Sequence, residues 1–234
     1  MIDHYDWSGG REAMLRLGRP EAPLVLIAPA LFEEANRTRA LTLTVMRALA
    51  DLGVASVLPD LPATGESLID TSAARLADWE SAYAALATQL SKTRRVHGAG
   101  IRGGALVDRS AALISRWHFA PVAGEALVRD MMRARQAAGR EAGHAPDPAD
   151  QSPDGPPIEL AGNLVSRELL ANLRAASPTS AGKVRTVRLT SDPMPSDHAV
   201  DGAPLWRRSE PGNDTILAAI LAADLASWIA ACGN

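Results

Sequence analysis

The residues from His97 to Ala105 read HGAGIRGGA, and this stretch decides the fold of the chain. Directly before the glycines, Arg95 to Ala99 reads as a strand, and after them Ala105 to Ile114 reads as a helix. The glycines fall at the junction, where a strand and a helix pass so close together that larger side chains do not fit. The stretch therefore predicts a tight turn from a strand into a helix.

The segment Gly100 to Gly104 has the register of a nucleophile elbow, G-x-S-x-G. In such an elbow the central residue sits on a strained turn at the carboxyl edge of the sheet. The central residue here is Arg102, and its guanidinium stays protonated at ordinary pH, so it cannot act as a nucleophile. The spacing thus predicts a hydrolase-like turn without the serine.

Two interpretations of Arg102 remain open at this point. In the structural one, the glycines only permit close packing and Arg102 makes a buried ion pair. In the other, Arg102 holds an anion together with the free N–H groups of a helix N-terminus. The phosphate-loop patterns G-x-G-x-x-G and G-x-x-x-x-G-K-[ST] are both missing from this stretch, so nucleotide binding is weakly supported.

Short apolar runs and amphipathic stretches alternate along the rest of the chain. Pro23 to Pro29 (PLVLIAP) is typical of a buried strand, and the helical spacing that follows ends at Gly53. The expected strands are 23–29, 54–58, 95–99, 116–122, 158–161 and 183–189, and the expected helices are 36–52, 71–90, 105–114, 124–138, 166–176 and 214–231. This alternation predicts an α/β fold, with a mostly parallel, doubly wound sheet in a single domain over residues 1–234.

The segment from Gly139 to Pro157 breaks this alternation. Its prolines, glycines and acids cannot build a core, so a mobile surface loop is expected over 139–157. Such a loop either acts as a lid or is simply disordered.

Composition excludes several classes of function. The hydrophobic share of 47% and the charged share of 22% are those of a soluble globular protein, and the net charge of −3 argues against nucleic-acid binding. A single cysteine rules out an internal disulfide, and no H-E-x-x-H or similar spacing suggests a metal, so no cofactor is expected. Neither a signal-peptide pattern nor an apolar run of about 18 residues is present, which favours a cytoplasmic protein without a membrane span.

Several motifs together resemble one known family. The stretches that carry the resemblance are Ala28–Arg37 (APALFEEANR), Asp60–Ser67 (DLPATGES), Trp117–Arg133 (WHFAPVAGEALVRDMMR), Ile158–Leu170 and Gly202–Trp206 (GAPLW). They are similar to motifs of the exosortase A system-associated hydrolase 2 family, which also carries arginine at the elbow. The resemblance covers the chain from about residue 20 to the last expected helix. Ala28 and Ala63 stand where that family usually has proline and glycine.

This resemblance implies an α/β-hydrolase-like fold with a reduced cap. It also implies a bacterial protein associated with exosortase and exopolysaccharide systems. The word hydrolase in the family name rests on the fold, which does not establish chemistry.

A complete triad would need an acid after a late strand and a histidine in the loop before the last helix. Asp192 follows the expected strand 183–189, but the loop 207–213 contains no histidine. His198 comes only a few residues after Asp192, so this pair is a weak catalytic candidate. We expect His97 and His118 to be structural.

Glu33 and Glu34 are expected at the mouth of the site, beside the oxyanion position. Because Arg102 should emerge at the same edge of the sheet, one of these acids could pair with it. The predicted ligand pocket comprises Arg102, Ile101, Gly103, Ala30, Leu31, Glu33 and Glu34.

The leading hypothesis is a catalytically degenerate protein that binds a small anionic ligand or a partner in this pocket. One alternative is an active ester or thioester hydrolase that uses unrecognised groups, such as Asp192 with His198. Another is a scaffold protein in export. The oligomeric state stays open.

Overall fold

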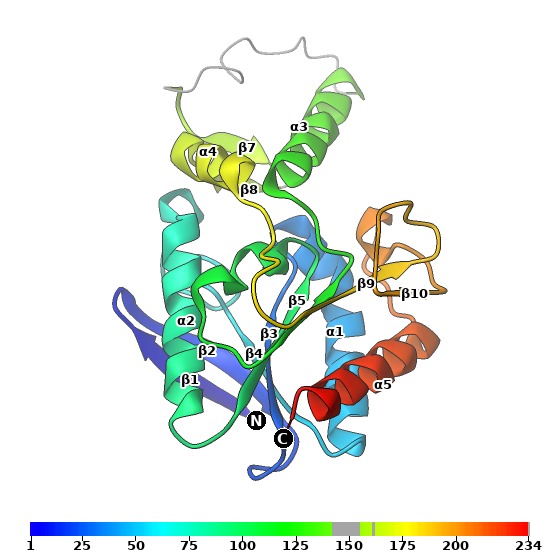
Figure 1. The fold of residues 1–234 in the computed structure, drawn as a ribbon. Helices are drawn as coiled ribbons and strands as arrows, with labels where there is room; N and C mark the ends of the chain where they lie inside the picture. The colour runs from blue at the N-terminus through cyan, green and yellow to red at the C-terminus, as the bar shows by residue number, and fades with distance from the viewer. Residues whose placement is uncertain (142–154, 161, 234) are drawn as a thin grey trace.

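A computed structural model describes residues 1–141, 155–160 and 162–233, and an eight-stranded sheet runs through its centre (Figure 1). The strand order is β1-β2-β4-β3-β5-β6-β9-β10. The bounds are β1 Ile2–Trp7, β2 Gly10–Leu17, β3 Leu24–Ala28, β4 Ala55–Pro59, β5 Val96–Ile101, β6 Arg116–Phe119, β9 Val184–Leu189 and β10 His198–Val200. The strands from β4 to β10 in this order are parallel, whereas β1 and β2 form an antiparallel hairpin at one edge. The predicted mostly parallel sheet is confirmed.

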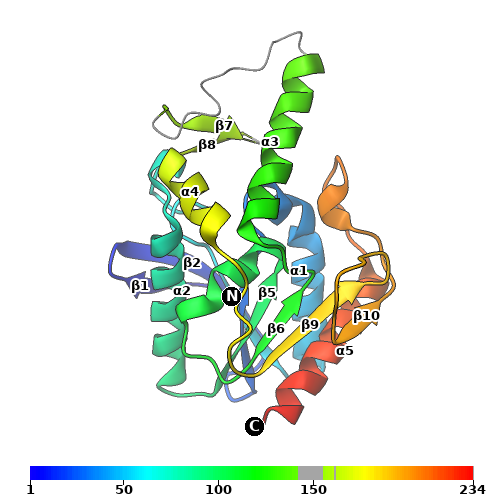
Figure 2. The same ribbon diagram turned by 45° about the horizontal axis from the view of Figure 1, so that its top comes forward.

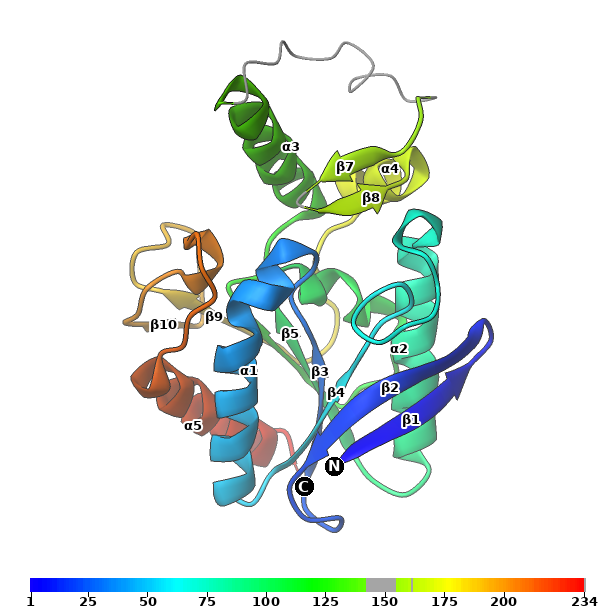
Figure 3. The ribbon, with the colours of Figure 1, turned by 180° about the vertical axis from the view of Figure 1, so that it is seen from behind.

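Helices cover both faces of the sheet (Figures 1 and 3). α1 (Glu33–Asp51) and α5 (Thr215–Ala231) lie side by side on one face, over a core that includes Val25 and Ile27 of β3. α2 (Leu76–Ser91) packs on the opposite face, over Leu24 and Leu26. Because every residue of β3 is buried, its apolar run has no polar face and is covered from both sides. The fold is therefore doubly wound, as predicted.

A small cap stands above the carboxyl edge of the sheet, between β6 and β9 (Figure 2). It consists of α3 (Gly124–Glu141), the hairpin of β7 (Ile158–Leu160) and β8 (Asn163–Val165), and α4 (Arg167–Ala175). The loop prediction over 139–157 is wrong for residues 139–141, because α3 continues through them. Residues 142–154 lie outside the described part of the chain.

Some elements differ from the sequence-based expectation at their ends or were not expected. α2 begins at Leu76 rather than at residue 71, after a separate 3-10 turn at Thr71–Ala73. The strands β1, β2, β8 and β10 were not predicted. β8 and β10 are only three residues long, and in β1 and β2 only Tyr5, Glu12 and Met14 are buried, so none of these strands gives a clear apolar period.

The predicted helix 105–114 is wrong. Two 3-10 turns, Arg102–Leu106 and Asp108–Ser110, lead from the elbow to β6 instead. A continuous helix would bond its carbonyls to N–H groups four residues later, but here a side chain takes that role. The Arg116 guanidinium donates to the carbonyl oxygen of Asp108 at 3.0 Å and to that of Ala111 at 2.7 Å.

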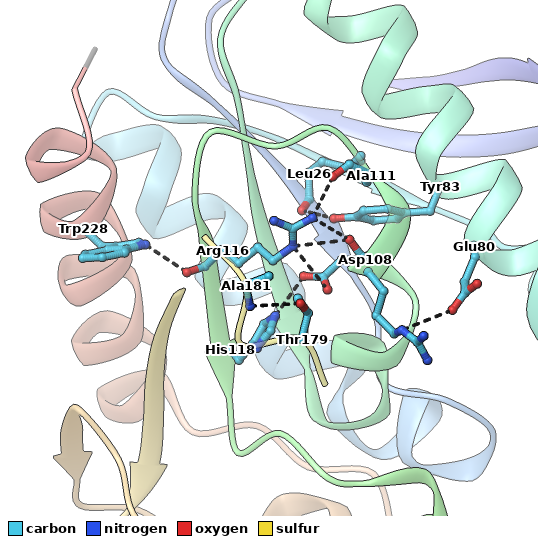
Figure 4. A network of polar contacts seen from close by, with 11 residues as sticks. Leu26, Glu80, Tyr83, Asp108, Ala111, Arg116, His118, Thr179, Ala181 and Trp228 are labelled. Carbon is cyan, nitrogen blue, oxygen red and sulfur yellow. Dashed lines mark hydrogen bonds and ion pairs between the residues drawn. The ribbon is translucent and has the colours of Figure 1, made fainter. Parts of the chain in front are cut away.

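This guanidinium belongs to a buried polar network on the α2 face of the sheet (Figure 4). The Asp108 side chain is 0% exposed; its Oδ2 lies 2.9 Å from Nε2 of His118, and its Oδ1 lies 3.7 Å from Nε of Arg116. Nearby, the Tyr83 hydroxyl donates to the carbonyl oxygen of Leu26 at 2.7 Å. Burial raises the pKa of Tyr83 well above its ordinary value, and the negative charge of Asp108 adds to this. The network replaces the missing helix as the link between the elbow and β6.

Replacing Arg116 should therefore destabilise the whole fold. We expect Arg116→Met to lower the free energy of unfolding by about 3–5 kcal/mol, because Asp108 stays buried with one ionic partner fewer. Urea denaturation followed by circular dichroism measures the change. Arg133→Met is the matched control, because Arg133 is 70% exposed in its pair with Asp130, and should cost less than about 1 kcal/mol. Equal effects of the two replacements would contradict the role given to Arg116.

Candidate functional site

Arg102 occupies the central position of the elbow that the glycine spacing predicts. It follows directly after β5 and has a φ of 53°, in the left-handed region that side chains other than glycine rarely adopt. A Cβ on Gly104 would lie 2.2 Å from the carbonyl oxygen of Ala28, and a Cβ on Gly100 would lie 2.8 Å from Cα of Ala105. Both glycines are therefore required by close backbone approach, which confirms the predicted register.

The Arg102 guanidinium is held by a bidentate ion pair with Glu34. Its Nη2 lies 2.8 Å from Oε1 and its Nε lies 3.2 Å from Oε2 of Glu34. The two side chains are only 10% and 16% exposed. Nη1 donates to the carbonyl oxygen of Ala120 at 3.0 Å, and the guanidinium carbon stacks 4.5 Å from the ring centre of Trp206. The expected ion pair is thus formed, and Glu34 is the acid that forms it.

Glu33 has a different partner, although it is adjacent in the sequence. Its Oε1 accepts a hydrogen bond from Nη2 of Arg37, one helical turn along α1, at 2.5 Å. Arg37 in turn donates from Nη1 to the carbonyl oxygen of Trp206 at 2.9 Å. α1 thus fixes both the guanidinium of Arg102 and the loop that brings Trp206 onto it.

The structure does not bring Asp192 and His198 together as a catalytic pair. Asp192 follows β9, as predicted, but its carboxylate accepts from Nη1 of Arg188 at 2.7 Å and from the N–H of Met194 at 3.0 Å. Burial alone would raise the pKa of Asp192. These two hydrogen bonds and the charge of Arg102 outweigh that effect, so its pKa lies below the ordinary value.

His198 lies at the start of β10 and contacts α5 instead. Its Nδ1 is 2.7 Å from Oδ1 of Asp224, which also accepts from Nη2 of Arg185 at 2.7 Å. Burial would raise the pKa of Asp224, but the hydrogen bonds from Arg185, Trp117 and His198 lower it. These contacts hold β10 and β9 against α5.

Trp206 is the residue of the loop before α5 that contacts the elbow. In a triad enzyme the loop after the last strand carries the base to the nucleophile. Here the loop after β10 carries Trp206, which is 7% exposed, onto Arg102, and its ring meets that of Phe119 edge-on at 5.8 Å. The one signal for this residue in the sequence is its position in the GAPLW motif before the last helix.

The remaining histidines expected to be structural are confirmed as buried, bonded side chains. Nδ1 of His97 lies 2.8 Å from the Ser115 hydroxyl, and burial lowers the pKa of His97 below its ordinary value. His118 belongs to the network of Asp108. Within the described ranges, no three His, Cys, Asp or Glu side chains gather as metal ligands, and no helix is long and apolar enough to cross a membrane.

A cavity of about 360 Å³ opens between the elbow, the start of α1, α3 of the cap and the loop of Trp206. Four of the predicted pocket residues line it: Leu31, Glu33, Glu34 and Arg102. Ala30 lines a different cavity, and Ile101 is buried in the core on the α1 face. Gly103 lies beneath Leu31, so close that an added Cβ would be 3.1 Å from Cγ of that leucine. We name this space the elbow cavity.

Comparison with solved structures shows that the chain has an α/β-hydrolase fold. No protein-family profile and no curated protein sequence matches it. A putative hydrolase from Agrobacterium vitis is similar over 98% of this chain and 99% of its own, with a TM-score of 0.61 and 16% identity. Alpha/beta hydrolase domain-containing protein 10 from mouse is similar over 99% of both chains, with a TM-score of 0.62 and 14% identity. The bottromycin epimerase BotH, solved with bottromycin A2, is also similar over 99% of both chains, with a TM-score of 0.57 and 13% identity.

The coupling between Arg102 and Glu34 can be measured with a double-mutant cycle. We expect Arg102→Met alone to lower the free energy of unfolding by about 3–5 kcal/mol, because it leaves a largely buried carboxylate without its cation. With Glu34→Gln also present, the loss should be smaller than the sum of the two single losses, by about 0.5–3 kcal/mol. The pair of Arg37 and Glu33 supplies the control cycle, with Arg37→Met and Glu33→Gln, since Glu33 is 41% exposed. Additive effects at Arg102 and Glu34 would show that the pair contributes nothing.

Proposed function

We propose that the chain is a catalytically degenerate protein of α/β-hydrolase fold, and that its elbow cavity binds a small anionic ligand. The observation that carries this proposal is the position of Arg102 at the elbow and its ion pair with Glu34. A protonated guanidinium stands at the nucleophile position and is neutralised by Glu34. The fold does not stand against this proposal, because one fold can carry many unrelated functions.

Two further features argue against a serine-type hydrolysis. Nucleophilic catalysis needs a hydroxyl or thiol within reach of a base that a third group orients. The elbow presents no such group, and Trp206, which contacts it from the loop before α5, is not a base. Ser67, the serine of the motif after β4, accepts hydrogen bonds from the N–H groups of Ala63 and Ile69, as a turn residue does.

The charges around the elbow cavity favour an anionic occupant. Four arginines and three acids line it. Three ion pairs use all three acids: Arg37 with Glu33, Arg102 with Glu34, and Arg133 with Asp130. Arg207 is exposed at the rim and forms no ion pair with any residue that the structure describes. The site therefore has one positive charge in excess, available to a carboxylate or phosphate.

The biological setting that we propose rests on the motifs alone. Stretches such as Ala28–Arg37 and Asp60–Ser67 resemble the exosortase A system-associated hydrolase 2 family. We accordingly place the protein in a bacterial exosortase or exopolysaccharide system. Its ligand there is a small anion, and a protein partner that presents a carboxylate would use the same cavity.

The purified protein should not hydrolyse p-nitrophenyl acetate or butyrate above the rate of a denatured control. Arg102→Ser should not create activity, because the loop before α5 brings Trp206 rather than a histidine to the elbow. Release of p-nitrophenolate at pH 7–8 is the measurement. Turnover that a covalent serine reagent abolishes would favour the alternative, an active ester or thioester hydrolase.

Anion binding should raise the melting temperature. A ligand that binds only the folded state stabilises it by mass action, so phosphate or acetate at fixed ionic strength should increase Tm relative to chloride. Arg207→Gln should remove this increase without lowering Tm in chloride. Arg208→Gln is the matched control, because Arg208 is adjacent, exposed and outside the cavity lining. An identical anion response in all three proteins would refute the elbow cavity as the site.

A further inference from the structure

A second cavity, of about 350 Å³, lies on the other side of the segment that links β3 to α1. Leu31 and Phe32 line both cavities and therefore form the wall between them. The other sides of the second cavity come from α1, from the loop 60–71 after β4, and from β8 and α4 of the cap. We name it the β4-loop cavity. None of the charged residues of the elbow cavity reaches it.

The floor of the β4-loop cavity is apolar and well fixed. Trp79, Leu61 and Leu169 line it and are at most 2% exposed. The Phe32 ring meets the Trp79 ring edge-on, with centroids 5.7 Å apart. Nε1 of Trp79 donates to the carbonyl oxygen of Pro62 at 2.7 Å, so the indole presents only carbon to the cavity. This floor suits an aliphatic or aromatic body.

Hydrogen-bond donors without acceptors lie around the same cavity. The Ser67 oxygen accepts from two backbone N–H groups, and its own proton has no acceptor among the described residues. Arg39 and Asn36 line the cavity from α1 and are exposed, and neither makes a hydrogen bond or ion pair with the described part of the chain. Water satisfies these donors in the free protein, and they are available to an acceptor that a ligand brings.

The one acid in the lining does not fill that role. Asp60 Oδ2 accepts from the N–H of Glu66 at 3.0 Å, and the carboxylate lies against the backbone of Gly65. It is thus turned toward its own loop. Thr38 and Thr42 also line the cavity, but their hydroxyl protons are donated to carbonyls of α1. The polar side of the cavity therefore consists mainly of donors and one cation.

The loop that builds this side is preformed. The Thr64 hydroxyl accepts from the N–H of Leu61 at 2.9 Å and donates to its carbonyl at 2.8 Å. Ala63 is held with a φ of 64°. Such side-chain bonds to the backbone fix the loop before any ligand arrives, which lowers the entropy cost of binding.

We propose that the β4-loop cavity is a second ligand site, which takes an amphipathic carboxylate. The apolar body of the ligand packs on Trp79, Leu61 and Leu169, and its carboxylate accepts from Arg39, Asn36 and Ser67. The cavity volume lies within the range of small-molecule sites. This site is separate from the anion site of the elbow cavity and does not depend on it.

Titration calorimetry with decanoate and with 1-decanol tests the proposal, with the melting temperature of each variant measured alongside. The unmodified protein should bind decanoate more tightly than 1-decanol. Arg39→Gln should lower the affinity for decanoate by about tenfold, the effect of one charge-assisted hydrogen bond. It should leave the affinity for 1-decanol unchanged. Ala35→Phe, which fills the cavity from α1, should lower the affinity for both ligands by at least about tenfold. Its Tm should equal that of the unmodified protein.

Arg47→Gln is the matched control, because it removes an exposed arginine of α1 that lines neither cavity. It should bind both probes like the unmodified protein. Arg207→Gln, which removes the exposed cation of the elbow cavity, should keep the binding of decanoate in the β4-loop cavity. Three results would overturn the proposal: no binding of decanoate by the folded protein, equal decanoate affinities in the unmodified protein and Arg39→Gln, or loss of decanoate binding in Arg207→Gln. The last result would place the ligand in the elbow cavity. If Ala35→Phe does not fold, the comparison of Arg39→Gln with Arg47→Gln decides.

Discussion

The bidentate ion pair between Arg102 and Glu34 joins four parts of the fold at one point. Arg102 comes from the end of β5 and Glu34 from the first turn of α1, while Ala120 after β6 and Trp206 after β10 complete the contacts of the guanidinium. Removing two ions from water is costly, and this cost is offset only when the geometry is good and the remaining donors are bonded. The positions of the surrounding segments are thus set by the need to satisfy one cation.

The same constraint bears on the proposal that the elbow has no serine triad. A triad needs a nucleophile and a base that move protons, and therefore groups whose charge changes near neutral pH. Arg102 keeps its charge at any ordinary pH, and Trp206 has none to change. Asp192, the residue in the position of the acid, is bonded to Arg188 and Met194. The protein has the fold of a hydrolase, and we propose that it lacks the chemistry of one.

The sequence predicts those features that depend on local spacing. The glycines around Arg102 predict the elbow because backbone approach there forbids a Cβ, and the apolar run 23–29 predicts a buried strand. The helix expected over 105–114 is wrong because Arg116, from the next strand, bonds the carbonyls that a helix would have used. Neither the pairing of Arg102 with Glu34 rather than Glu33 nor the contact of Trp206 with Arg102 could be predicted from the sequence. Each depends on which way a side chain points across segments far apart in the chain.

The span of these contacts has a kinetic consequence. Arg102 and Glu34 are 68 positions apart, and Trp206 belongs to the last loop before the final helix. We expect the contact of Trp206 with Arg102 to form late in folding, because joining segments so far apart in the chain costs loop entropy before the contact contributes. Interactions formed after the transition state slow unfolding rather than speed folding. On this expectation, the cation at the elbow slows the unfolding of the finished protein and so protects it against proteolysis.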